Sequence, residues 1–313
     1  MNYRAQGAIE YLLIIGAAIL IVAIVILAAT GILFGGQTQA ATSGTQSQGA
    51  VSGLRSLAYV SLGGHDYIKS DPIITSLTNV WRLDESGGST FSDEVGSIIG
   101  TCASANCPSH STGVAGNAAL FSNSSSDQFI QIPNLPTSNN ETYAMWFNVS
   151  ASGAVSSFIL VPEEDGNNPD SFWHYRGQLY VDPSNKVHWN VGSWGGDQTL
   201  SKCDPSDSSG GYVIQLISTK NISLNSWHFA VLTVSYRPFS ASLYLDGEYQ
   251  DKKDTSFNCT SDMHIAWLGR RKSINGALAI FPSFSGNIDE FSIWNRVLSS
   301  TEISELYANA VKK

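Results

Sequence analysis

The chain has 313 residues, enough for one large domain or two ordinary ones. It carries 26 acidic and 17 basic side chains, which gives a net charge of −9 at pH 7. This balance excludes nucleic acid and anionic lipid as its main partners, because both require a basic binding surface.

A single apolar run extends from Tyr11 to Phe34. As a helix it is long enough to cross the roughly 30 Å hydrocarbon core of a bilayer, and it exceeds the apolar core of a secretory signal peptide. Arg4 precedes the run, so we expect the N-terminus to stay in the cytoplasm and the rest of the chain to lie outside the cell.

The residues around the start of this run carry a specific pattern, with Gln6, then Glu10 four residues later, then the apolar helix. They resemble the class III signal peptide of archaeal type IV pilin-like proteins, although Ala5 stands where such leaders often carry glycine. The resemblance implies that a prepilin peptidase cuts between Ala5 and Gln6 and that the helix then packs in a filament core. Glu10 would pair there with the new α-amine of a neighbouring subunit, since a buried carboxylate needs such a partner. The alternative is a plain signal anchor with Glu10 among the lipid headgroups.

Composition, together with the resemblance to pilin-like leaders, divides the chain into four parts. Residues 1–5 are the predicted cytoplasmic leader, and residues 6–34 are the predicted membrane or filament helix. Residues 35–71 are a spacer and transition segment, which begins with a Gly/Ser/Thr/Gln-rich stretch typical of flexible linkers. Residues 72–313 are the predicted main domain.

The main domain has the pattern of a β-protein, with short apolar runs between clusters of Gly, Asn, Asp, Ser and Pro. Residues 227–236 are rich in aromatic and β-branched side chains and predict a strand. Asp246 and Gly247 are the pair that a two-residue type I′ hairpin turn favours. Near the C-terminus, Ser299 and Glu302 form a predicted capping box at the start of a short helix.

Five segments of this domain, in order, resemble successive blocks of the laminin-G-like concanavalin A superfamily. They are VWRLDESGGSTFSDEVG, GVAGNAALFSNSSSDQFIQIP, TYAMWFNVS, WHFAVLTVSYRPFSASLYLDGEY and FSGNIDEFSIWNRVLSSTEISELYA. The resemblance spans residues 79–308 and implies a mainly β fold, a jelly-roll concanavalin A-like β-sandwich, here preceded by the long N-terminal apolar helix.

The four cysteines do not form a CxxC pair and have no paired histidines nearby, which argues against a zinc site. An even number of cysteines in an exported chain favours two disulfides, Cys102–Cys107 and Cys203–Cys259. The alternative is four free buried thiols.

Five Asn-X-Ser/Thr triplets support the same extracellular compartment and are candidate N-glycosylation sites. They begin at Asn123, Asn140, Asn148, Asn221 and Asn258.

Some members of the superfamily are glycoside hydrolases, which need two carboxylates that flank the scissile bond. The nearest candidates are the acidic run at residues 163–165 and the pair Asp289–Glu290, which the resemblance places on a structural edge of the sandwich. The catalytic Glu-x-Asp-x-Glu pattern of that family is absent from the sequence. We therefore expect a protein that is not an enzyme.

The resemblance also implies a structural calcium ion that joins the first strand region to the last. The matching positions are Asp84, Glu85 and Asp289, with Asp93 as an addition. Carboxylates suit calcium, which prefers several oxygen ligands. The alternative is that Asp289 caps a turn or pairs with Arg296.

Aromatic side chains cluster between residues 172 and 194, and their faces suit stacking on sugar rings. The candidates for a carbohydrate-binding groove are Trp173, Tyr175, Trp189 and Trp194. The alternative is that they fill the core, and strand alternation sends about half of such side chains inward.

Together these patterns predict a pilin-like subunit at the cell surface that displays a lectin-like domain for adhesion or glycan binding. Its expected partners are other pilin-like subunits through the N-terminal helix, the membrane before assembly, and surface glycans. The alternative is a membrane-tethered lectin module that does not polymerise, and a surface glycoside hydrolase is disfavoured.

Overall fold

The computed structural model describes residues 59–103, 106–122, 128–150, 157–163, 177–192, 213–255, 265–269 and 284–311. They belong to a compact unit that begins at Tyr59, ahead of the domain start expected at residue 72. The predicted leader, the apolar helix and most of the spacer lie outside the described residues. Among the residues that are described, no helix combines the length and the apolar character needed to cross a bilayer.

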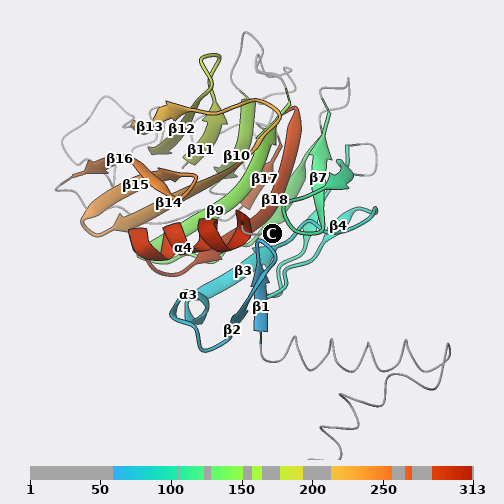
Figure 1. Ribbon diagram of the computed structural model, residues 1–313, viewed down its shortest axis with the longest axis horizontal. Coiled ribbons are helices and arrows are strands. Elements are labelled where there is room, and N and C mark those ends of the chain that lie inside the picture. The colour runs from blue at the N-terminus through green and yellow to red at the C-terminus, as the bar shows by residue number, and fades with distance from the viewer. Residues whose placement is uncertain are drawn as a thin grey trace, which may run out of the picture. The chain divides into compact units, whose positions relative to one another are not determined.

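The described residues form two large antiparallel sheets that face each other, which confirms the predicted mainly β sandwich (Figure 1). We call the first the helix-side sheet. Its strand order is β16 (Glu248–Asp254), β15 (Phe239–Leu245), β14 (Trp227–Tyr236), β9 (Asn140–Val149), β18 (Gly286–Trp294), β7 (Asn117–Phe121) and β6 (Ser109–Thr112), and β3 (Leu77–Trp81) also pairs with β18.

We call the second the opposite sheet. Its order is β13 (Val213–Asn221), β12 (Lys186–Gly192), β11 (Gly177–Val181), β10 (Ser157–Glu163), β17 (Ile265–Leu268), β8 (Ile130–Pro133), β5 (Gly100–Thr101) and β4 (Thr90–Phe91).

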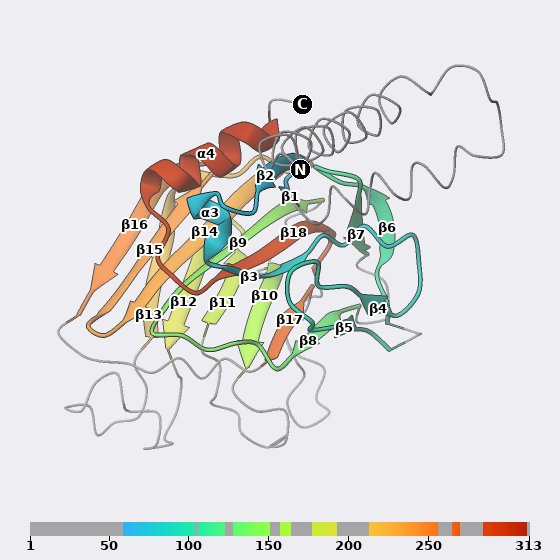
Figure 2. The ribbon, with the colours of Figure 1, turned by 90° about the horizontal axis from the view of Figure 1, so that it is seen from below.

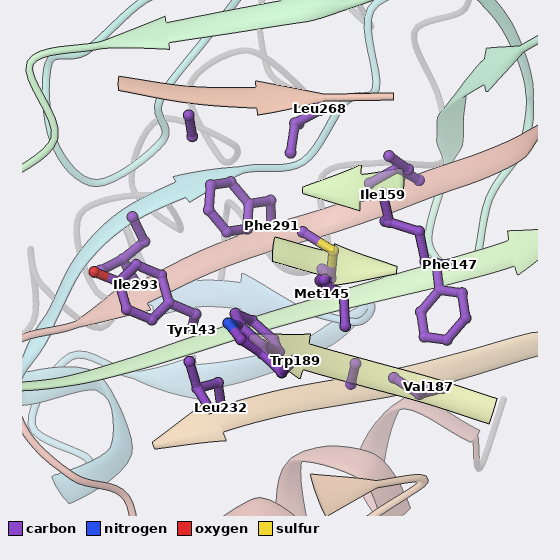
Figure 3. Packing of buried hydrophobic residues seen from close by; sticks show 14 of the residues in the cluster. Tyr143, Met145, Phe147, Ile159, Val187, Trp189, Leu232, Leu268, Phe291 and Ile293 are labelled. Carbon is purple, nitrogen blue, oxygen red and sulfur yellow. The ribbon is translucent and has the colours of Figure 1, made fainter. Parts of the chain in front are cut away.

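The main core lies between the two sheets and is aromatic and aliphatic throughout. Figure 3 shows Tyr143, Met145 and Phe147 of β9 close to Trp189 of β12 and Leu268 of β17. These side chains are buried because strand alternation turns every second residue of each sheet toward the other sheet.

A second apolar cluster covers the outer face of the helix-side sheet, where α4 (Ser300–Val311) crosses the strands (Figure 2). Leu306 of α4 belongs to this cluster together with Trp146 of β9 and Phe229 of β14. The short helix α3 (Pro72–Thr75) and a hairpin of β1 (Tyr59–Leu62) and β2 (His65–Ile68) complete the layer. The face of the helix-side sheet that points away from the core is therefore covered by α4, α3 and the β1–β2 hairpin.

Local sequence signals are confirmed at one hairpin turn and at the start of one helix. Asp246 and Gly247 have φ angles of 53° and 76° between β15 and β16, as a type I′ turn requires. At the start of α4, Glu302 N donates to Ser299 Oγ (3.3 Å) while Ser299 N donates to Glu302 Oε2 (2.8 Å), which is the predicted capping box.

Candidate functional site

Of the four aromatic residues predicted to bind sugar, one, Trp189, lies among the described residues. Trp189 is 2% exposed and packs in the core, where its ring lies 6.4 Å from that of Tyr143. It therefore fills the interior and is excluded as a stacking surface. The other three candidates, Trp173, Tyr175 and Trp194, lie outside the described residues.

Strand alternation instead turns a different set of side chains to the outer face of the opposite sheet. In β12, Val187 and Trp189 point inward, so His188 and Asn190 point outward. In β11, Tyr180 lies between two core residues and also points outward. The alternation of the segment KVHWNVG was the signal that could have revealed this arrangement.

An aromatic row runs along this outer face from β12 to β8. Its members are His188, Tyr180, Trp267 and Phe129. The His188 and Tyr180 rings stack with centroids 4.8 Å apart and an interplanar angle of 14°. Tyr180 and Phe129 both pack against Trp267, and the Phe129 and Trp267 centroids lie 5.1 Å apart. Trp267 and His188 are buried, at 6% and 9% exposure, so the half-buried rings of Tyr180 and Phe129 are the members of this row that a ligand can reach.

Polar groups flank the aromatic row on the β12–β13 side. Gln215 Nε2 donates a hydrogen bond to Tyr180 Oη over 3.0 Å, and the Asn190 side chain also bonds to this hydroxyl. Partial burial raises the pKa of Tyr180, so its hydroxyl stays protonated at neutral pH. Asn190 Oδ1 and His188 Nδ1 are buried and have no hydrogen-bond partner among the described residues. The groups open to a ligand on this side are therefore the exposed Gln215 side chain and the half-buried Tyr180 side chain.

Asp182 fixes the orientation of the histidine ring. Its Oδ2 lies 3.0 Å from His188 Nε2, and its Oδ1 accepts hydrogen bonds from the backbone of Ser184 and Lys186. Partial burial raises the pKa of Asp182, but these hydrogen bonds outweigh burial and hold the pKa below its ordinary value. Asp182 thus holds the Nε2 edge of the imidazole ring in place.

The acids expected to hold calcium come together only in part. Asp84 and Asp289 both bind one turn: Asn117 N donates to Asp84 Oδ1 (2.7 Å), and Val114 N donates to Asp289 Oδ2 (2.8 Å). Glu85 accepts a hydrogen bond from Ser92 N instead. In the part of the chain that the structure describes, no three Asp, Glu, His or Cys side chains are grouped to hold a metal ion.

Asp93, the additional position, organises its own loop. Its carboxylate accepts hydrogen bonds from the Asn79 side chain and from the backbone of residues 80, 95, 96 and 98. Asp289 keeps one carboxylate oxygen, Oδ1, that is buried without a hydrogen-bond partner among the described residues. Of the predicted ligands, Asp84 and Asp289 thus hold the same turn, and Asp84 also contacts Arg82.

The expected edge position of Asp289 and Glu290 is wrong. Strand β18 lies inside the helix-side sheet, between β9 and β7, and both side chains are buried. Glu290 adopts the left-handed conformation at φ 52°, within an irregular part of the β18–β9 pairing. Arg82 connects the group, with its guanidinium 3.0 Å from Asp84 and 3.6 Å from Glu290. The Arg296 guanidinium donates to Glu302 instead of Asp289. Asp289 accepts a hydrogen bond from Val114 N, so it caps a turn and does not pair with Arg296.

A disulfide joins Cys102 and Cys107. The second expected pair, Cys203–Cys259, lies outside the described residues. Among the glycosylation candidates, Asn140 and Asn221 are exposed, while Asn148 is half-buried within β9 between paired strands. Asn123 and Asn258 lie outside the described residues.

Comparison with known proteins identifies the sandwich. The family model described as the concanavalin A-like lectin/glucanases superfamily matches residues 123–304, more than half of the chain. No curated protein sequence matches the chain.

Three solved structures share the fold at low sequence identity. Domain 4 of an extracellular arabinanase from Geobacillus stearothermophilus, in complex with arabinotriose, has a TM-score of 0.53 and 17% identity over 74% of this chain and 98% of that one. The binding domain of Paraclostridial Mosquitocidal Protein 1 gives 0.53 and 14%, over 75% of this chain and 52% of that one. The ligand-binding domain of botulinum neurotoxin serotype D, in complex with N-acetylneuraminic acid, gives 0.51 and 16%, over 74% of this chain and 50% of that one. The matched region thus spans about half of these two toxin domains.

Proposed function

The chain belongs to the concanavalin A-like lectin/glucanases superfamily, and we propose that it is a cell-surface subunit that binds glycans through the outer face of its opposite sheet. The observation that carries this proposal is the aromatic row of His188, Tyr180, Trp267 and Phe129, in which the half-buried Tyr180 and Phe129 are accessible and the exposed Gln215 amide lies beside the Tyr180 hydroxyl. Sugar recognition combines stacking on aromatic faces with hydrogen bonds to hydroxyl groups, and this surface offers both.

The comparisons support a carbohydrate as the ligand class. Two of the structures with the same fold were solved with sugars bound, one with arabinotriose and one with N-acetylneuraminic acid. At this level of identity the likeness establishes the fold alone, so the side chains of the face carry the argument for this chain.

Replacing Tyr180 with alanine tests the proposal. The change removes the ring that links His188 to Trp267 and the hydroxyl that Gln215 and Asn190 contact. We expect glycan affinity to fall at least about tenfold, which is about 1.4 kcal/mol. A glycan array identifies the ligand, with arabinotriose and N-acetylneuraminic acid as the first soluble probes, and calorimetry measures the affinity.

Tyr249→Ala is the matched control for this experiment. Tyr249 is an exposed tyrosine on β16 of the helix-side sheet, so its loss should leave glycan affinity unchanged. A wild-type protein that binds no glycan on the array would refute the proposed function. Equal losses in the two variants would refute the assignment of the site.

The position of one candidate acidic pair supports a proposal of binding without catalysis. Asp289 and Glu290 are 0% and 3% exposed, and both lie within the helix-side sheet, away from the proposed face. They cannot flank a glycosidic bond from that position, as a pair of hydrolytic carboxylates must. We therefore propose a lectin-like module without glycosidase activity.

We also propose that a calcium ion stabilises the fold near Asp84 and Asp289, with the buried Asp289 Oδ1 as a ligand. Millimolar calcium should then raise the melting temperature by about 5 °C relative to EDTA, as expected for a ligand present well above its Kd. Asp289→Asn should abolish this rise, while Glu85→Gln, which alters an acid outside the pair, should keep it. Identical melting of the wild type in calcium and in EDTA would contradict the proposal.

The display of the domain is proposed from the N-terminal sequence. The order of Gln6, Glu10 and the apolar run supports a pilin-like subunit that is cut before Gln6 and assembles through its helix. The disulfide and the exposed sequons at Asn140 and Asn221 fit an extracellular domain. A membrane-tethered lectin that does not polymerise is the second candidate, and Glu10 distinguishes the two.

A further inference from the structure

The Cys102–Cys107 disulfide lies next to the segment that leads into β8. Phe129 N donates a hydrogen bond to Asn106 O over 3.0 Å, and Gln128 Nε2 donates to Cys107 O over 3.1 Å. Both acceptor carbonyls belong to the small loop that the disulfide closes. Gln128 is itself held by Ser122 N, which donates to its Oε1 over 2.6 Å.

The same segment supplies one end of the aromatic row. The Phe129 ring lies 5.1 Å from that of Trp267, and Trp267 in turn contacts Tyr180. The position of Phe129 is therefore tied to the carbonyls of residues 106 and 107, which are not themselves members of the row.

The disulfide attaches Cys107 to Cys102, which follows β5. Cys102 follows β5 directly and packs in the main core, and Thr101 of β5 pairs with Gln131 of β8. Figure 2 shows β5 and β8 side by side at one end of the opposite sheet. A covalent bond from Cys102 to Cys107 thus ties the carbonyls of residues 106 and 107 to the sheet whose outer face Phe129 occupies.

We propose that the Cys102–Cys107 disulfide is a positioning element of the binding face, which holds Phe129 against Trp267 through the carbonyls of Asn106 and Cys107. This inference rests on the proposed glycan-binding function and extends it to a residue pair outside the face. Without the bond, Cys102 stays with β5, while residues 106 and 107 are held near it only by the backbone and by the hydrogen bond from Asn106 N to Ala103 O (2.7 Å). The carbonyls of Asn106 and Cys107 then sample more conformations, and the Phe129 ring must be ordered when the ligand binds.

A double-mutant cycle tests the proposal. Its variants are Cys102→Ser with Cys107→Ser, Phe129→Ala, and the combination of all three changes. We expect the paired serine variant and Phe129→Ala each to weaken glycan binding about fivefold or more, and the triple variant to be no weaker than Phe129→Ala alone. Multiplied losses in the triple variant, or unchanged affinity in a folded serine variant, would overturn the proposal.

Gln128→Glu is a second variant that leaves the disulfide in place. Glutamate keeps an acceptor for Ser122 N but loses the donor to Cys107 O, so binding should weaken without loss of the fold. This variant provides the test if the serine variant does not fold. Unchanged glycan affinity of Gln128→Glu would then count against a role for the Asn106 and Cys107 carbonyls in positioning Phe129.

Amide exchange separates this inference from the proposed function. The Phe129 amide should exchange at least about tenfold faster in the serine variant, while the amides of Ile130 and Ile132 in β8 keep their protection. If the wild type binds no glycan but this change occurs, the proposed function fails and the positioning role stands. Unchanged exchange at Phe129 refutes the positioning role whatever the protein binds.

Discussion

Replacing Glu290 with glutamine is expected to stabilise the sandwich at about pH 8 and to leave its stability near pH 4.5 almost unchanged. The carboxyl is 3% exposed, and burial, together with the neighbouring Asp289, raises its pKa from 4.5 to about 8 despite the opposing effect of Arg82. Holding the ionised form in the fold costs free energy, and a neutral amide of the same shape avoids this cost. A shift of this size corresponds to an effect on the order of 4 kcal/mol.

The direction of the pH dependence follows from which state binds more protons. Between pH 4.5 and about 8 the folded chain keeps the Glu290 proton that the unfolded chain has lost, so the free energy of unfolding falls as pH rises. Above about pH 8 both states are ionised and the loss is complete. Burial raises the pKa of Asp289 to about 7, which adds to the same trend. Glu302 does not interfere, because Arg296 lowers its pKa to about 2 and its contribution changes only below pH 4.5.

Urea unfolding in EDTA at about pH 5, 6.5 and 8 measures this effect. The matched control is Glu305→Gln, which removes an exposed carboxylate from α4 and should follow the wild type at every pH. A wild-type stability that does not change across this range, or a Glu290→Gln variant less stable than the wild type at about pH 8, would contradict the expected burial of charge.

Glu10→Ala is expected to abolish filament assembly if the chain is a pilin-like subunit. In that case the Glu10 carboxylate pairs with the α-amine of a neighbouring subunit, which cleavage before Gln6 has created. Removing one partner of such a buried pair costs about 3–5 kcal/mol, because the other charge is left uncompensated. Membrane insertion should become easier, since a charge has been removed from the start of the apolar helix.

The experiment compares sheared filament fractions with membrane fractions from cells that express either form. Mass spectrometry of the N-terminal peptide provides the control, because both forms should begin at Gln6 if processing is intact. Wild-type protein that is confined to membranes, with Glu10→Ala indistinguishable from it, would support the membrane-tethered lectin. A mature chain that begins after the apolar run would refute the pilin-like hypothesis altogether.

The features of this fold that were predictable from sequence are those that neighbouring residues decide. The strand over Trp227–Tyr236 appears with the expected bounds, since its aromatic and β-branched side chains favour extended backbone. The Asp246–Gly247 turn and the Ser299–Glu302 cap also follow from local preferences, for positive φ angles and for bonds to free N–H groups. Five weak local blocks in the right order were enough to indicate the sandwich.

The site depended on features that no local pattern contains. The aromatic row joins β12, β11, β17 and β8, and its rings meet only because β10 and β17 bring distant segments together. Trp189 looked like a ligand-binding residue by its chemistry, but the pleat of β12 turns it to the core and turns His188 outward. Strand alternation allowed the inward direction of Trp189 to be predicted. The sequence did not show which side chains of adjacent strands lie beside it.

The sequence alone determined the chemistry of the chain: an apolar N-terminal run with Glu10 at its start, an acidic sandwich domain, and the local turns and caps that punctuate it. Only the tertiary structure decided which acids and aromatics share an environment. It buried Asp289 and Glu290 in a central strand, kept Glu85 and Asp93 for local hydrogen bonds, and aligned Tyr180 with Trp267. The physical reason is that backbone preferences act over a few residues, while burial, pKa and ring contacts depend on strands that pair across more than a hundred residues of sequence.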